Sequence, residues 1–329
     1  MIYSSFSSKK NAYFITSLCL SILKKTKQSW KTVHSLLSMD EEKILDIFNN
    51  LENIKQLDYQ NIHISNIIFQ EISTITPKDI KEAEQLLIKV QTEGWNISFY
   101  NAKYYPQQWQ YLQGQPPPLI FFKGTLELNN NNTGIAVVGT TQPTVRCVEK
   151  VKELVKFIID TGAYHISGGA LGVDRTGHDT ALLLGGTSQA ILPCGIFHYT
   201  IPYYWEEAIK HDKMQVISPW LPTAKWESQQ AVRRNLFIAV LAKIGCILQP
   251  THEGGSLRVA QDILSRNLPV FIYEPQYYAK VLRHLPQVLP LVNDEGTINF
   301  TLVEQAIIKV RDIIEESPGN LFDLSNRSG

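Results

Sequence analysis

The sequence has few cysteines and no paired cysteine motif, which argues against a disulfide framework or a zinc site. Its four cysteines, Cys19, Cys147, Cys194 and Cys246, stand far apart and form no C-x-x-C pair. Disulfide-stabilised domains and structural zinc sites both need cysteines at closer, patterned spacings. We therefore expect buried, reduced thiols in a cytoplasmic protein, with no metal site.

The sequence also lacks an excess of charge of either sign. It has 31 Lys+Arg and 31 Asp+Glu, a formal net charge of +0. The chain as a whole is thus not an obvious polyanion binder, and contact with nucleic acid requires a local patch. Before Asp40 the only charged side chains are lysines, which indicate a solvated helix face or, alternatively, a binding patch. These lysines are Lys9, Lys10, Lys24, Lys25, Lys27 and Lys31.

No apolar run near the N-terminus is long enough to cross a membrane. The run 12–23 has the length of a signal-peptide core, but lysines at 24, 25 and 27 follow it in place of a small-residue cleavage site. We expect a buried helix there and no association with a membrane.

Three segments are predicted, an N-terminal helical domain (1–103), an α/β domain (104–275) and a C-terminal helical extension with a tail (276–329). Pro77 at a first helical position marks the start of one helix in the first segment. In the last segment, 302–314 is expected to form one helix.

The middle segment alternates short apolar runs with helical periods. This alternation predicts a Rossmann-like, doubly wound parallel sheet, which binds ligands beyond the carboxyl ends of its strands. The expected strands are 135–138, 163–166, 189–192, 215–217, 245–248 and 269–272. The expected helices include 174–184, 203–210, 227–241 and 256–265.

A glycine-rich turn follows the second of these strands, with Ser167, Gly168, Gly169 and Gly172 leading to Asp174. Glycine lets a backbone turn sharply and approach a ligand closely. The helix that follows directs free N–H groups at an anion, with Asp174 as its expected N-cap. A tight turn without a ligand is the alternative.

A second glycine-rich turn, Gly254-Gly255-Ser256, opens a later helix at the same edge of the sheet. The first strand ends there too, in Gly139-Thr140. Two such helix starts at one edge predict a phosphate-binding cleft. For Thr140 the alternative is local hydrogen bonding within a turn.

Arg233, Arg234 and Asn235 lie inside an expected helix. The guanidinium group is a planar fork suited to phosphate, and a pair of exposed surface arginines is the alternative. Further candidates are Arg146, Arg175, Arg258 and His178, of which His178 is also explained as a structural histidine.

In order and spacing, these motifs resemble the DNA-processing protein A (DprA/Smf) family, a branch of the Rossmann-like nucleotide-binding superfamily. The matching stretches are 105–106, 118–124, 137–140, 167–174, 234–235 and 255–257. The resemblance implies a non-enzymatic protein without a cofactor, which binds single-stranded DNA and self-associates, expected here as a homodimer. It also implies loading of a RecA-type recombinase during DNA recombination and natural transformation.

Three positions depart from the family's pattern. Thr141, Leu171 and Leu236 stand where the family usually has arginine. Each lost phosphate contact lowers DNA affinity and flattens its salt dependence. A nucleotide sensor with a small phosphorylated ligand in the same cleft is therefore an alternative. A related class, the phosphoribohydrolases, needs a catalytic glutamate where Gln261 stands, and an amide cannot act as general acid or base.

Overall fold

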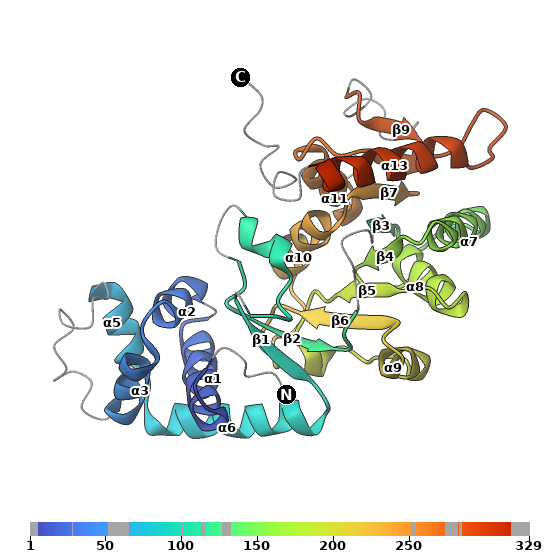
Figure 1. Cartoon of the computed structure of the whole chain (residues 1–329). Coiled ribbons are helices and arrows are strands. Elements are labelled where there is room, and N and C mark those ends of the chain that lie inside the picture. Colours follow the sequence, from blue (N-terminus) through green and yellow to red (C-terminus); the bar gives the residue numbers. More distant parts are fainter. Residues whose placement is uncertain are drawn as a thin grey trace, which may run out of the picture. The chain divides into compact units, whose positions relative to one another are not determined.

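In the computed structural model, the contacts within the chain divide it into two compact units (Figure 1). The structure describes residues 6–27, 29–51, 66–100, 102–112, 116–126, 133–251, 254–273, 282 and 285–316. The first unit comprises 1–123, 194–198 and 218–225, and the second comprises 124–193, 199–217 and 226–329. The expected tail at 317–329 lies outside the described residues. None of the helices within the described ranges is long and apolar enough to cross a membrane.

Helices dominate the first unit, as expected. They are α1 (Lys9–Lys25), α2 (Trp30–Leu37), α3 (Glu41–Asn49), α5 (Asn66–Ile72) and α6 (Pro77–Thr92). In the apolar run of α1, Ala12 and every residue from Ile15 to Leu23 are buried, and α1 packs against α2, α3 and α6. The prediction of a buried helix is thereby confirmed.

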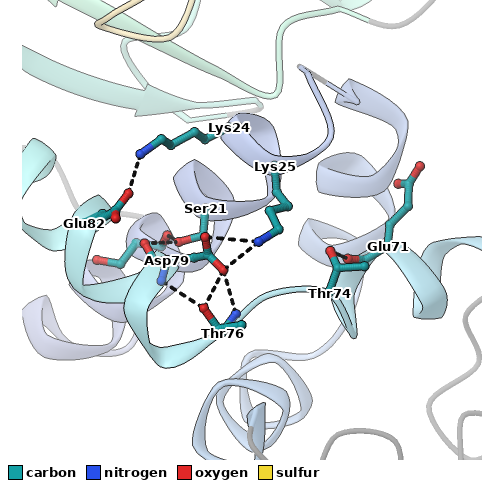
Figure 2. A network of polar contacts seen from close by, with 9 residues as sticks. Ser21, Lys24, Lys25, Glu71, Thr74, Thr76, Asp79 and Glu82 are labelled. Atoms are coloured by element: carbon teal, nitrogen blue, oxygen red, sulfur yellow. Dashed lines mark hydrogen bonds and ion pairs between the residues drawn. The ribbon is translucent and has the colours of Figure 1, made fainter.

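The start of α6 shows how local sequence fixes a helix boundary. The Thr76 hydroxyl accepts the Asp79 N–H, and the Asp79 side chain accepts the Thr76 N–H, which together form a capping box. Pro77 occupies the first helical position, as predicted. Figure 2 shows the polar contacts around this corner, where Lys25 bridges to Asp79 at 3.2 Å and Lys24 to Glu82 at 2.6 Å.

The expectation that the first hundred residues are wholly helical is wrong at its end. Strand β1 (Asn96–Phe99) pairs antiparallel with β2 (Leu119–Lys123), which places Ile97 opposite Phe121. A single 3-10 turn, Gln107–Tyr111, lies between them. The four residues of β1 are too few to show a strand period, and their partner lies beyond a proline-rich connector.

The second unit contains a parallel sheet in the order β6-β5-β4-β3-β7-β8-β9, which confirms the predicted fold class (Figure 1). The strands are β3 (Gly134–Gly139), β4 (Tyr164–Ser167), β5 (Ser188–Ile191), β6 (Met214–Ser218), β7 (Ile244–Leu248), β8 (Val270–Tyr273) and β9 (Val288–Pro290). Strand β9 was not predicted. It is only three residues long and ends in Pro290, so it carries no readable period.

Helices follow the strands of this sheet from β3 to β7, and a last helix follows β9. They are α7 (Val145–Asp160), α8 (Val173–Leu183), α9 (Tyr203–Lys210), α10 (Ser228–Leu241), α11 (Gly255–Leu264) and α13 (Phe300–Glu316). The first unit also contains a short 3-10 turn, Ile196–His198. One core cluster joins Ile135 and Val137 of β3 to α7 and α13. All four cysteines are buried, as predicted.

Strand β3 is the point at which the chain changes direction across the sheet. Strands β4, β5 and β6 follow it on one side, and β7, β8 and β9 lie on the other. In a doubly wound sheet, ligands bind beyond the carboxyl ends of the strands at this switch point. The residues that follow β3, β4 and β7 are therefore the candidates for a ligand-binding site.

Candidate functional site

The first glycine turn (167–172) leaves β4 at Ser167 and enters α8 at Gly172. Gly169 and Gly172 have φ angles of +72° and +82°, in the left-handed region that favours glycine. A Cβ added to Gly172 would lie 2.5 Å from the Thr140 carbonyl oxygen, and the N–H of Val173 donates to that oxygen at 3.1 Å. The turn thus packs directly on the end of β3.

The end of β3 is equally crowded. Gly139 pairs with Leu248 of β7, and a Cβ on Gly139 would collide with the Leu248 carbonyl oxygen. The Thr140 hydroxyl accepts the N–H of Gln142 at 3.1 Å, which is the local turn bond considered as the alternative. The structure therefore brings 139–140 and the first glycine turn together.

The second glycine turn (254–256) opens α11. Gly254 is its N-cap and supplies no side-chain hydrogen bond. The N–H groups in the first turn of a helix have no partner within the helix and carry a partial positive charge. Ser256 is the second residue of α11, so its backbone N–H belongs to this set. This turn has the local geometry of an anion site.

Arg234 and Asn235 connect the two glycine turns through hydrogen bonds to Gly168 and Gly255. Arg234 Nη1 donates to the carbonyl oxygens of Gly168 at 2.6 Å and Ile191 at 2.7 Å, and its Nε donates to Asn235 Oδ1 at 3.1 Å. Asn235 Nδ2 donates to the Gly255 carbonyl oxygen at 3.0 Å. Both side chains are buried, with 8% and 6% of their surface exposed.

Asp174 does not cap α8, contrary to the prediction. The N-cap is Gly172, and Asp174 is buried in the first turn, where its carboxylate accepts the N–H of Gly168 at 3.1 Å. Burial raises the pKa of Asp174, and the nearby Arg234 opposes that rise. The carboxylate therefore supports the first glycine turn from inside the protein.

The other candidate cations lie in different surroundings. Arg233 is exposed on α10, and Arg258 is exposed on α11, 3.9 Å from Asp262. Arg175 lies over the Trp205 ring at 4.7 Å and donates to the Tyr199 hydroxyl at 3.3 Å.

Arg146 is exposed at the start of α7, and one of its guanidinium nitrogens lies beside Gly296. Gly296 lies in the turn before α13 and belongs to neither glycine turn. Arg233 and Arg258 are thus the exposed cations on the helices that carry the site.

His178 is placed as a structural histidine. It is fully buried, and its Nδ1 lies 2.7 Å from the Ser188 hydroxyl, which also contacts His165 Nδ1 at 2.8 Å. Burial lowers the pKa of both histidines, that of His165 to about 3. Both rings are therefore neutral at physiological pH.

Sequence reasoning missed Tyr199, whose hydroxyl donates to the Gly169 carbonyl oxygen at 2.9 Å. It follows a short 3-10 turn and carries no motif, so nothing in the sequence singles it out. The positions that depart from the family's pattern lie around the same turn. Thr141 and Leu171 are exposed, Leu171 by 70%, and Leu236 is half-buried. Among the described residues, no group of His, Cys, Asp or Glu could hold a metal ion.

This sheet order, with two glycine turns opening helices at its carboxyl edge, places the chain in the class of Rossmann-like α/β proteins. The family model described as DNA recombination-mediator protein A matches residues 96–287, so the chain belongs to this family, the DprA/Smf family. The resemblance recognised in the motifs is confirmed. The family is one of DNA-processing proteins and is not known for an enzymatic activity.

Two curated relatives show how far the similarity extends. The DNA processing protein DprA of Bacillus subtilis is 27% identical over 205 residues, which cover 61% of this chain and 66% of the relative. Protein Smf of Synechocystis is 25% identical over 161 residues, 47% of this chain and 40% of the relative. The chain therefore matches less than two thirds of either relative's length.

Two relatives of solved structure share the fold. The DNA processing protein A of Streptococcus pneumoniae matches with a TM-score of 0.56 at 18% identity, covering 83% of this chain and 96% of that one. The protein of the same name from Helicobacter pylori, which has a single-stranded DNA binding mode, matches with a TM-score of 0.52 at 21% identity, covering 64% and 97%. At these identities the likeness shows the fold alone.

Proposed function

We propose that this protein binds single-stranded DNA at the carboxyl edge of its parallel sheet and acts as a recombination mediator. The observation that carries the proposal is the joining of the two glycine turns by Arg234 and Asn235 into one surface. Family membership and the single-stranded DNA binding of the Helicobacter relative support it. No chemical step is required, because the role is to hold a phosphate chain.

Backbone and side chains divide the work in this proposal. The N–H groups at the start of α11 and around the first glycine turn donate hydrogen bonds to phosphate oxygens, since helix N-termini favour anions. Arg233 and Arg258 add exposed positive charge on α10 and α11. With Thr141 and Leu171 exposed where the family usually has arginine, few cations line the surface. The salt dependence of binding should therefore be shallow.

Fluorescence anisotropy with a labelled oligo(dT) tests the proposal. We expect saturable binding at about 50 mM salt that weakens as salt rises. Arg233→Ala should weaken binding and reduce the log–log salt slope by about 0.7, the value for one phosphate contact on a single strand. Lys156→Ala removes the same charge from the C-terminal half of α7, away from the glycine turns, and should change nothing. Absence of binding by the wild type at about 50 mM salt would overturn the proposal.

A nucleotide sensor is the second candidate, favoured by the exposed Leu171 and Thr141 beside intact glycine turns. A small phosphorylated ligand needs the turns but no extended basic groove. A nucleotide that binds only the folded state raises the melting temperature, and binding at 100 times Kd adds about 2.7 kcal/mol. A nucleotide that stabilises the protein and competes with oligo(dT) would favour this candidate, and no stabilising nucleotide would reject it.

The proposed mediator role includes a homodimer, a RecA-type recombinase as partner and a location in the cytoplasm, where the DNA is. These rest on family membership. Light scattering after size exclusion tests the dimer, and a recombinase filament-assembly assay on coated single-stranded DNA tests the partner. A monomeric mass at all concentrations would contradict the first, and unchanged filament assembly the second.

A further inference from the structure

Two adjacent arginines on α10 lie in opposite surroundings. Arg233 is exposed, whereas Arg234 is 8% exposed. Successive residues of a helix are rotated by about 100°, so one neighbour can face solvent while the other faces the sheet. The two side chains share the same chemistry and need not share a role.

The Nη1 and Nε donors of Arg234 are directed at groups of the protein itself. Nη1 holds the carbonyl oxygens of Gly168 and Ile191, at the ends of β4 and β5, and Nε holds Asn235. The buried carboxylate of Asp174, which itself accepts the Gly168 N–H, supplies a counter-charge to Arg234. The positive charge of Arg234 is therefore largely balanced inside the protein.

Asn235 continues this chain of hydrogen bonds to the second glycine turn. Its Oδ1 accepts from Arg234 Nε, and its Nδ2 donates to the Gly255 carbonyl oxygen. One unbroken path thus runs from Gly168 through Arg234 and Asn235 to Gly255. We call these two residues the Arg234–Asn235 clip.

The clip sets the direction of the peptide groups in both turns. A trans peptide is planar, so fixing a carbonyl on one side directs the N–H of the next residue to the other side. Holding Gly168 O directs the Gly169 N–H away from Arg234, and holding Gly255 O directs the Ser256 N–H away from Asn235. The clip contacts the turns on their carbonyl side and leaves the N–H side to a ligand.

Both turns need glycine at the positions that the clip contacts. A Cβ on Gly168 would overlap the Arg234 guanidinium, and one on Gly255 would lie 2.8 Å from Asn235 Nδ2. Real Cβ atoms do not approach other atoms so closely, so the glycines and the clip fit as one unit.

We propose that Arg234 and Asn235 are positioning residues that lock the two glycine turns into one phosphate-binding surface, while neither side chain contacts DNA. This inference rests on the proposed function. The direct cationic contact on α10 is then Arg233. Loss of the clip misaligns backbone donors, so it lowers affinity without removing a phosphate contact.

Salt titrations of matched variants with labelled oligo(dT) test the clip. Asn235→Ala should weaken binding at least ten-fold with an unchanged salt slope, whereas Arg233→Ala should reduce the slope by about 0.7. Arg234→Lys keeps the charge but loses the fork, and should also weaken binding at least ten-fold. Arg233→Lys should stay within about three-fold, because a point charge still serves a phosphate.

Hydrogen exchange of the peptide spanning 254–257 provides a second measurement on folded protein. Asn235→Ala should speed exchange there while peptides of α7 exchange as in the wild type. If Arg234→Lys does not fold, Asn235→Ala decides alone, since it leaves the guanidinium in place. Wild-type affinity of Asn235→Ala, or a slope reduced as in Arg233→Ala, would overturn the clip. Failure of the wild type to bind would instead overturn the proposed function.

Discussion

Two polar networks, one in each unit, lie in opposite surroundings. In the first unit, the network between α1 and α6 lies at the surface, with side-chain exposures of 55% and 41% for Lys24 and Glu82 (Figure 2). In the second unit, Arg234 and Asp174 are 8% and 6% exposed and bond mainly to backbone. The charged groups of the first network therefore pair with each other at the surface, whereas those of the second hold backbone groups in the interior.

Water accounts for the difference. Exposed ion pairs contribute about 0–1 kcal/mol, because solvent screens them and long side chains lose entropy. Removing one partner of a buried pair costs about 3–5 kcal/mol, since the remaining polar groups stay desolvated. The lysines near the N-terminus thus fit a solvated helix face, while one inconspicuous arginine in α10 supports the whole site.

The largest expected effect comes from Arg234→Ala. It leaves the carbonyls of Gly168 and Ile191 without a donor and Asp174 without its counter-charge, so the second unit should lose about 3–5 kcal/mol of unfolding free energy. Urea titration monitored by hydrogen exchange of second-unit peptides measures this. Arg233→Ala is the matched control, expected to stay within about 0.5 kcal/mol. Equal losses for both variants would show that burial does not separate the two arginines.

The second effect is a loss of stability of the second unit in acid. Burial lowers the pKa of His165 to about 3 and that of His178 well below its ordinary value. Below about pH 6.5 the unfolded chain binds protons that the folded chain excludes, so stability falls as the pH falls towards 3. From about pH 7 to about pH 5.5 the two histidines should remove about 2.5 kcal/mol.

Substituting one of the two buried histidines tests whether they cause this pH dependence. His178→Gln should remove about half of it, whereas His211→Gln, at an exposed position, should leave it unchanged. Urea unfolding of the second unit at both pH values measures the loss. A pH dependence that survives His178→Gln in full would rule out that residue as its source.

A smaller effect is expected at the start of α6 in the first unit. Thr76→Ala removes the side chain of the capping box and should cost about 1 kcal/mol. Thr92 lies at the other end of α6, where its hydroxyl donates only to the Ile88 carbonyl, so Thr92→Ala should cost less than about 0.5 kcal/mol. Thermal unfolding, followed by hydrogen exchange of first-unit peptides, measures the stability lost in each variant. Equal losses for Thr76→Ala and Thr92→Ala would show that the capping box does not stabilise α6.

The smallest effect is expected for the exposed ion pairs. A double-mutant cycle on Lys24 and Glu82 should give about 0.2–1 kcal/mol at low salt and less at high salt. Lys156 and Asp160 form a similarly exposed pair in the second unit, at 2.6 Å, and should give the same result. A much larger coupling free energy for Lys156 and Asp160 would mean that exposure does not determine how much an ion pair contributes to stability.

Much of the second unit could be predicted from sequence because its burial is periodic. Helix α9 spans the expected 203–210, and the expected strand 245–248 differs from β7 by one residue. Apolar runs bounded by glycine carry the signal of a buried parallel strand. Both glycine turns were likewise recognisable, because each is a short run of glycines between an apolar strand and a helical period.

The rest depended on contacts between distant residues. Nothing local shows that Asp174 lies inside its turn or that β1 finds its partner beyond the prolines. Arg233 and Arg234 are indistinguishable in a sequence, and only the packing of α10 on the sheet separates them. The sequence pattern identified the two glycine turns, whereas only the fold shows which side chains support them and which face solvent.

The place of β3 between β4 and β7 has a consequence for protein synthesis. The carbonyls that the clip holds come from β4, β5 and α11, and the clip itself lies on α10, just before β7. A nascent chain that has left the ribosome as far as β6 contains the first glycine turn but neither the clip nor the second turn. The proposed phosphate-binding surface therefore becomes complete only after α11 has been synthesised.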